Sequence, residues 1–169
     1  MNTATQLKAL IRNISKEKKV NAQILLRNYM LERLLERISV SKYKHNFILK
    51  GGMLIAAMVG IDIRSTMDMD ATIKGVPASK ENIKMMFDEI LAVTVNDSVT
   101  MTIKSIDDIR DEADYAGYRV SVDTSFDGIK QTLKIDITTG DTITPCEVGY
   151  KFRLMLEDRT IEVLDKVFC

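Results

Sequence analysis

Three aspartates and a pair of glycines are the residues of this chain whose types and spacing could do chemistry. Gly51 and Gly52 follow a short apolar stretch, Asp68 and Asp70 lie one residue apart further on, and Asp136 stands alone among apolar neighbours. Glycines that open a helix let backbone N–H groups approach a phosphate, and the helix dipole favours the anion. Carboxylate oxygens are the ligands that Mg²⁺ prefers. This ordered set is what a metal-dependent nucleotidyl transfer site requires.

The three acids are expected to converge. Residues two apart on a strand point to the same face, so Asp68 and Asp70 can share metal ions while Met69 faces the core. Asp136 alternates with apolar residues in the same way. The pattern predicts catalytic and metal-binding roles for all three, with Asp68 and Asp70 bridging two Mg²⁺ or Mn²⁺ ions. Asp136 is expected to hold the catalytic ion and to help remove the proton of the acceptor.

A phosphate-binding loop is expected just before these acids. Lys50, Gly51 and Gly52 are predicted to bind nucleotide, with the glycine backbone against the β- and γ-phosphates. The hydroxyls of Ser65 and Thr66 are expected to add contacts to phosphate. Together with the acids they would align a nucleoside triphosphate (NTP), because nucleotidyl transfer needs charge stabilisation and in-line geometry more than covalent help.

Other polar residues have less definite roles. Arg64 is equally compatible with binding phosphate and with pairing with Asp62 or Asp68. His45, the only histidine, stands next to a lysine and is expected at the surface. No Ser–His or Cys–His nucleophile arrangement is supported, and the 10 methionines suit core filling better than a copper site.

Composition describes an ordinary globular protein. The 169 residues contain 24 basic and 24 acidic side chains, so an RNA-binding surface would have to be a local patch. Cys146 and Cys169 are the only cysteines, which argues against a disulfide framework and favours a reducing cytoplasm. Neither a signal peptide nor a long apolar run is present, which predicts a soluble intracellular protein.

Two amphipathic helices are expected at the N-terminus. The first is predicted to end near Ser15-Lys16, and Asn21 is placed to cap a longer second helix. The charged residues of the second helix are interpreted as a solvated face with i,i+3 and i,i+4 pairs, in preference to an RNA-binding role. They are Arg27, Glu32, Arg33, Glu36 and Arg37. We predict a helical appendage over residues 1–45 and a nucleotidyltransferase-like domain over residues 46–169.

Helices and strands mix in the remainder. A strand at 47–49 leads into a helix at 53–59, a strand at 67–73 carries the acid pair, and Ser79 caps a further helix. Period-two segments near 99–103, 118–122 and 133–137 predict three strands, the last two joined by an Asp127-Gly128 turn, with the unit closing at Pro145. The predicted class is α+β: a mixed sheet flanked by helices, with an N-terminal helical pair.

With these motifs in place, the chain resembles the AbiEii/AbiGii-type abortive-infection toxins, which belong to the polymerase-β-like nucleotidyltransferase superfamily. The resemblance covers most of the sequence. It rests on residues 29–35, 47–54, 64–70, 118–120, 134–137 and 140–145. It implies an enzyme that transfers a nucleotide from an NTP to an RNA acceptor such as tRNA, within a toxin–antitoxin or phage-defence system. It also implies a separately encoded antitoxin.

The resemblance weakens at the C-terminus. Family members continue into a helical region that contains a lysine in an Ala-Glu-Lys-type motif. This sequence stops at Cys169, and Lys166 matches that lysine poorly. The expectation is therefore a truncated member of the family. Two alternatives stay open: a nucleotidyltransferase that modifies a small molecule or a protein, and an inactive remnant that acts only through binding.

Overall fold

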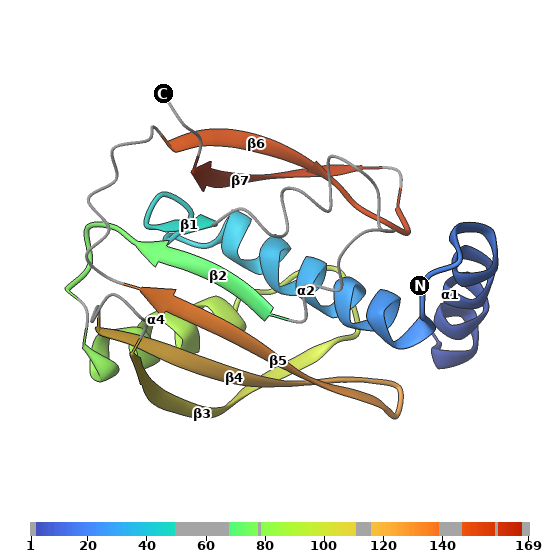
Figure 1. Ribbon diagram of the computed structural model, residues 1–169, viewed down its shortest axis with the longest axis horizontal. Coiled ribbons are helices and arrows are strands. Elements are labelled where there is room, and N and C mark those ends of the chain that lie inside the picture. The colour runs from blue at the N-terminus through green and yellow to red at the C-terminus, as the bar shows by residue number, and fades with distance from the viewer. Residues whose placement is uncertain are drawn as a thin grey trace.

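The computed structural model describes residues 3–49, 68–77, 79–110, 116–138, 147–157 and 159–166, and it confirms the α+β class (Figure 1). The helices are α1 (Ala4–Lys18), α2 (Ala22–Val40) and α4 (Lys80–Leu91). The strands are β1 (Phe47–Leu49), β2 (Asp68–Ile73), β3 (Thr100–Arg110), β4 (Ala116–Phe126), β5 (Ile129–Thr138), β6 (Glu147–Arg153) and β7 (Thr160–Lys166). The helix expected at 53–59 lies outside the described residues.

One mixed sheet of seven strands organises the molecule, in the order β3-β4-β5-β2-β1-β7-β6. The pairs β2–β5 and β1–β7 are parallel, whereas the other neighbours are antiparallel. The short strand β1 therefore lies between β2 and the late strand β7 (Figure 1). This order places β2 and β5, the two strands that carry the predicted acids, side by side.

The helix caps follow the sequence closely. Asn21 and Ser79 cap α2 and α4, accepting hydrogen bonds from the backbone N–H groups of Gln23 and Asn82. Helix α1 continues to Lys18, two residues past the expected end at Ser15-Lys16, and stops where Lys19 adopts a left-handed conformation.

The β4–β5 hairpin is confirmed at the expected turn. Asp127 and Gly128 have φ values of 47° and 85°, the positive pair that a two-residue type I′ turn requires. The preceding strand β3 is longer than the expected 99–103 segment because it continues past a bulge between Ile103 and Ser105 to pair along the whole of β4.

The β6–β7 hairpin was not anticipated, because the sequence pattern seemed to close the sheet at Pro145. Alternating apolar residues are nevertheless present in β7, where Ile161 and Val163 are both buried. This strand pairs in parallel with β1 at Ile48 and Leu49, which places it inside the sheet. Its position depends on a distant partner, and local alternation over so few residues does not reveal that partner.

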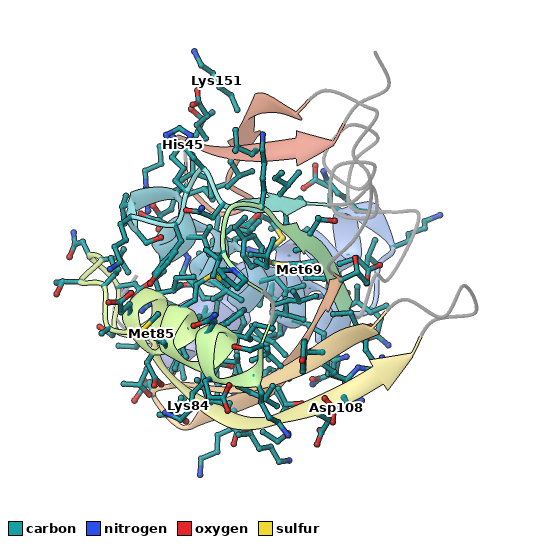
Figure 2. The ribbon with its side chains drawn as sticks, turned by 90° about the vertical axis from the view of Figure 1, so that its left-hand side faces the viewer. His45, Met69, Lys84, Met85, Asp108 and Lys151 are labelled. Atoms are coloured by element: carbon teal, nitrogen blue, oxygen red, sulfur yellow. The ribbon has the colours of Figure 1, made fainter. Side chains whose placement is uncertain are left out.

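A common apolar core joins the sheet to the helices. Met69 and Ala71 of β2 are buried beside the apolar sides of β4 and β5, in the same cluster as residues of α2 and α4. Figure 2 shows Met69 in the interior, whereas Lys84 and Met85 of α4 and the predicted surface residue His45 lie at the periphery. The alternation expected for β2 is therefore confirmed where its side chains are described.

The interpretation of the α2 charges as a solvated face was wrong. Glu32, Arg33, Glu36 and Arg37 are each less than 10% exposed. The turn between β6 and β7 and the segment before β3 cover this side of the helix and supply its polar partners. The helix also packs against β5, β7 and α4. The division of the chain at residue 45 remains a prediction.

Candidate active site

A row of three charged residues crosses three adjacent strands. Asp70 of β2 lies opposite Asp136 of β5, and Asp136 lies opposite Arg119 of β4. Neighbouring strands are about 4.8 Å apart, so the row brings two carboxylates and a guanidinium together on one side of the sheet. We use "acid row" below for Asp70 and Asp136. Asp70 is exposed and Asp136 is partly buried.

Arg119 donates hydrogen bonds to both carboxylate oxygens of Asp136. Its Nε donates to Oδ1 at 2.7 Å and its Nη2 donates to Oδ2 at 3.0 Å. This two-pronged contact is the strong, directional form of an arginine–carboxylate pair. The side chains are 37% and 18% exposed, so solvent screens the pair only in part.

The other predicted site residues are only partly placed. Asp68 begins β2 opposite Lys134, two positions before Asp70, but its side chain lies outside the described residues. The expected nucleotide-binding residues also lie outside them: Lys50, Gly51, Gly52, Ser65 and Thr66. Arg64 falls in the same gap. The described structure thus brings two of the three acids together and leaves the phosphate loop as a prediction.

The donor set of the acid row fits a hard divalent cation. No described part of the chain groups three or more His, Cys, Asp or Glu side chains around a point, so Asp70 and Asp136 are the described carboxylates available. Thr72 continues the alternation of Asp70, and its hydroxyl is buried without a hydrogen-bond partner. Oxygen ligands of this kind suit Mg²⁺ or Mn²⁺. Because each carboxylate oxygen has two lone pairs, Asp136 can bind Arg119 and still ligate a metal.

Arg119 is the site residue that sequence reasoning missed. It was noticed only as part of a motif around the third acid, without a role. A signal was available, because Arg119 is the one basic residue within the 11 residues of β4. Its alternation with the buried Val120 and Val122 places it on the same side as Asp136.

A surface hollow of about 530 Å³ lies toward the other end of the same strands. Its lining includes Thr102, Asp123 and Thr132, which are aligned across β3, β4 and β5, and the basic side chains of Arg27 and Lys130. These three aligned residues continue the alternation that carries Arg119 and Asp136. Lys130 and Asp136 are six positions apart on β5, which corresponds to about 20 Å along a strand.

A second group of charges is largely buried apart from Arg159, and we call it the α2 cluster. It consists of Glu32, Arg33, Glu36, Arg37, Asp97 and Arg159. Arg37 donates to both oxygens of Asp97 at 2.9 and 2.8 Å. Glu36 accepts from Arg159 at 2.6 and 2.7 Å, and Arg33 Nη1 lies 2.7 Å from Glu36 Oε2. These contacts tie α2 to the segment before β3 and to the β6–β7 turn.

The acids of the α2 cluster have opposite pKa shifts. Burial raises the pKa of Glu32 to about 8, although the backbone N–H of Met155 and the charge of Arg33 favour its ionised form. Burial would also raise the pKa of Glu36, but hydrogen bonds from Arg159 and the Arg33 charge lower it below its ordinary value. The cluster thus contains one carboxyl held neutral by burial and one held ionised by arginines.

A mixed sheet that places acids on adjacent strands, with oxygen donors suited to Mg²⁺, is the arrangement of a nucleotidyltransferase domain. The sequence of the chain agrees with this class. Residues 33–165 match the family described as nucleotidyl transferase AbiEii toxin, type IV toxin–antitoxin (TA) system. The chain belongs to this family, and the resemblance inferred from its motifs is confirmed. The match begins within α2 and ends within β7.

Two solved structures from Helicobacter pylori match part of the chain. A putative nucleotidyltransferase matches with a TM-score of 0.44 and 15% identity, over 85% of this chain and 55% of that one. The protein JHP933 matches with a TM-score of 0.43 and 14% identity, over 85% of this chain and 53% of that one. The chain thus spans about half the length of these structures. No curated protein matches it. Within the described residues, no helix is long and apolar enough to cross a membrane.

Proposed function

We propose that this chain is the nucleotidyl-transfer domain of a type IV toxin, which moves a nucleotide from an NTP to an RNA acceptor, with tRNA as the leading candidate. The observation that carries the proposal is the parallel register of Asp70 with Asp136 on adjacent strands. Family membership supports the reaction class. Such a toxin acts in the cytoplasm and is held in check by a separately encoded antitoxin.

In this reaction the acceptor oxygen attacks the α-phosphorus, and the bond to pyrophosphate breaks. Bound Mg²⁺ or Mn²⁺ would stabilise the charge on the attacking and leaving oxygens. Asp70 and Asp136, joined by Asp68, would hold the cation, and Asp136 would also accept the proton of the acceptor hydroxyl. Lys50, Gly51 and Gly52 would contact the triphosphate, with Ser65 and Thr66 adding hydroxyl donors.

The surface hollow favours an RNA acceptor over a small molecule. It is open and polar, and Arg27 and Lys130 can contact phosphodiester groups while its hydroxyl side chains donate to them. Its distance from the acid row of about 20 Å would let an extended strand reach both places. A small acceptor would have no use for contacts so far from the reacting atoms.

The proposal is tested by incubating the purified chain with labelled NTPs, Mn²⁺ and one of three acceptors: total tRNA, an aminoglycoside or a protein extract. Labelled tRNA from the native chain, with none from Asp70→Asn, is the expected result. Lys84→Gln is the matched control, because Lys84 is exposed on α4, where it pairs with Asp88. Equal labelling by native chain and Asp70→Asn would refute the site.

A second readout does not depend on the acceptor. Mn²⁺ should raise the melting temperature, because a ligand that binds only the folded state stabilises it by mass action. Asp70→Asn and Asp136→Asn should each remove this response, whereas Lys84→Gln should keep it. A native chain that ignores millimolar Mn²⁺ would mean that the acids do not form a metal site.

A further inference from the structure

The contact between Arg119 and Asp136 is not explained by metal binding alone. A carboxylate placed to ligate a cation is held through both oxygens by a guanidinium, at 2.7 and 3.0 Å. The neighbouring Asp70 lies one strand further along the same row. The positive guanidinium of Arg119 thus lies next to the position that a cation bound by Asp70 and Asp136 would occupy.

Two carboxylates at adjacent positions of a parallel pair repel one another when both are ionised. Their separation is about that of neighbouring strands, and a like-charge pair opposed across strands destabilises the sheet. Arg119 supplies one positive charge at the end of this row. Because its side chain is 37% exposed and Asp136 is 18% exposed, this charge acts through a medium less screening than bulk water.

We propose that Arg119 is a positioning residue that serves as a built-in counter-charge for the acid row, keeping Asp136 beside Asp70 without metal and lowering the affinity of the row for metal. The inference rests on the proposed metal site. Arginine suits this role because its planar fork fixes the orientation of a carboxylate as well as its charge. The second lone pairs of the Asp136 oxygens stay available, so Arg119 need not leave when a cation binds.

Replacing Arg119 should lower the stability of the metal-free protein and raise its affinity for Mn²⁺. Removing Arg119 takes away the guanidinium that is hydrogen-bonded to Asp136, so the metal-free protein should lose stability. The same removal deletes a positive charge next to the cation, so Mn²⁺ should bind more tightly and restore more stability. An ordinary structural ion pair would give only the first effect, which makes the metal response the discriminating measurement.

The test compares melting temperature against Mn²⁺ concentration for four proteins: the native chain, Arg119→Gln, Asp136→Asn and Lys134→Gln. Lys134 is the matched control because it is an exposed cation on the same side of β5, two positions before Asp136. For Arg119→Gln we expect a lower metal-free melting temperature and a Mn²⁺ midpoint lowered at least about threefold. Lys134→Gln should shift the midpoint far less, because an exposed charge is well screened.

A double variant separates this role from general damage to the sheet. Arg119→Gln combined with Asp136→Asn should recover much of the metal-free stability lost in Arg119→Gln, since the unbalanced charge is gone. If Arg119→Gln does not fold, folding of the double variant supports the proposal and failure of both overturns it. Arg119→Lys, which keeps the charge without the fork, should give an intermediate midpoint.

The outcomes also separate this inference from the proposed function. If Mn²⁺ changes the melting temperature of neither the native chain nor Arg119→Gln, the proposed metal site is refuted. A native response that disappears in Asp136→Asn, together with an unchanged midpoint in Arg119→Gln, would keep the site and overturn the role of Arg119. A higher midpoint in Arg119→Gln would show that Arg119 assists metal binding, which also contradicts the proposal.

Discussion

The α2 cluster and the acid row use the same kinds of side chain in opposite ways. In the α2 cluster the charges other than Arg159 are largely buried, and Arg37 and Asp97 are joined by paired hydrogen bonds. In the acid row Asp70 is exposed, and one guanidinium stands beside two carboxylates. The α2 cluster is largely shielded from solvent and pairs its charges within the protein, whereas the acid row is accessible to solvent at Asp70.

This difference indicates which of the two is built to bind something. A buried charge that loses its partner is strongly destabilising, so such clusters must be complete within the protein. An exposed carboxylate such as Asp70 is screened by water, and a cation can reach it from solvent. Charge pattern in the sequence alone does not distinguish the two, since both regions read as acids and bases between apolar residues.

The largest effect is expected from breaking the α2 cluster at Asp97. Asp97→Asn would leave Arg37 buried with a neutral partner, and Arg33, 3.7 Å from the same carboxylate, would also lose a counter-charge. We expect a loss of about 3–5 kcal/mol in the free energy of unfolding, measured by urea denaturation. A loss under about 1 kcal/mol would mean that solvent reaches this cluster.

A pH-dependent effect is expected from Glu32. Its pKa of about 8 in the folded state exceeds the ordinary value of 4.5, so the folded state binds the proton more tightly than the unfolded chain. Stability is therefore full below about pH 4.5 and is lost as the pH rises toward 8. Glu32→Gln should gain roughly 2–4 kcal/mol relative to the native chain across that window. Parallel stability curves for both proteins would contradict the pKa shift.

A smaller effect is expected from neutralising the acid row. Asp70→Asn removes one of two neighbouring carboxylates, so metal-free stability should stay level or rise by up to about 1 kcal/mol. Urea denaturation without divalent ions measures this directly. A loss above about 1 kcal/mol would show that Asp70 is part of the structural framework, which would make the two regions alike.

The smallest effect is expected from an exposed pair outside both regions. Lys84 and Asp88 form an i,i+4 pair on α4 with side chains 64% and 52% exposed. Asp88→Asn should change the free energy of unfolding by less than about 0.5 kcal/mol. This variant sets the baseline for the other three, and a comparable change in all four would remove the distinction between buried and exposed charge.

What the sequence revealed depended on the range of the interactions involved. Caps and turns are local, so Asn21, Ser79 and the Asp127-Gly128 turn could be predicted from residue type. The pairing of Asp70 with Asp136 could be anticipated because both acids alternate with apolar residues. The pairing of Asp136 with Arg119 could not, because it depends on the register of the β4–β5 hairpin.

The errors have the same origin. The buried α2 charges looked solvated because their partners, such as Asp97 and Arg159, are far away in the sequence. The β6–β7 hairpin was missed because β7 finds its place next to β1 rather than next to the strands that precede it. Charged residues have the same helical spacing whether they face water or pair with a distant arginine. The residue pattern alone therefore cannot distinguish a solvated helix face from a buried, paired one.

The position of β7 has a consequence for the order in which this protein can fold as it is made. Ile48 pairs with Leu164, and Glu32 accepts a hydrogen bond from Met155, 123 residues later in the sequence. Helix α2 and strand β1 therefore leave the ribosome long before these partners. Contacts this distant in sequence slow folding, since a long loop must close first. Until then one edge of β1 is unpaired, a state prone to wrong association. A nascent chain without residues 147–166 should therefore be more sensitive to protease and to aggregation than the completed one.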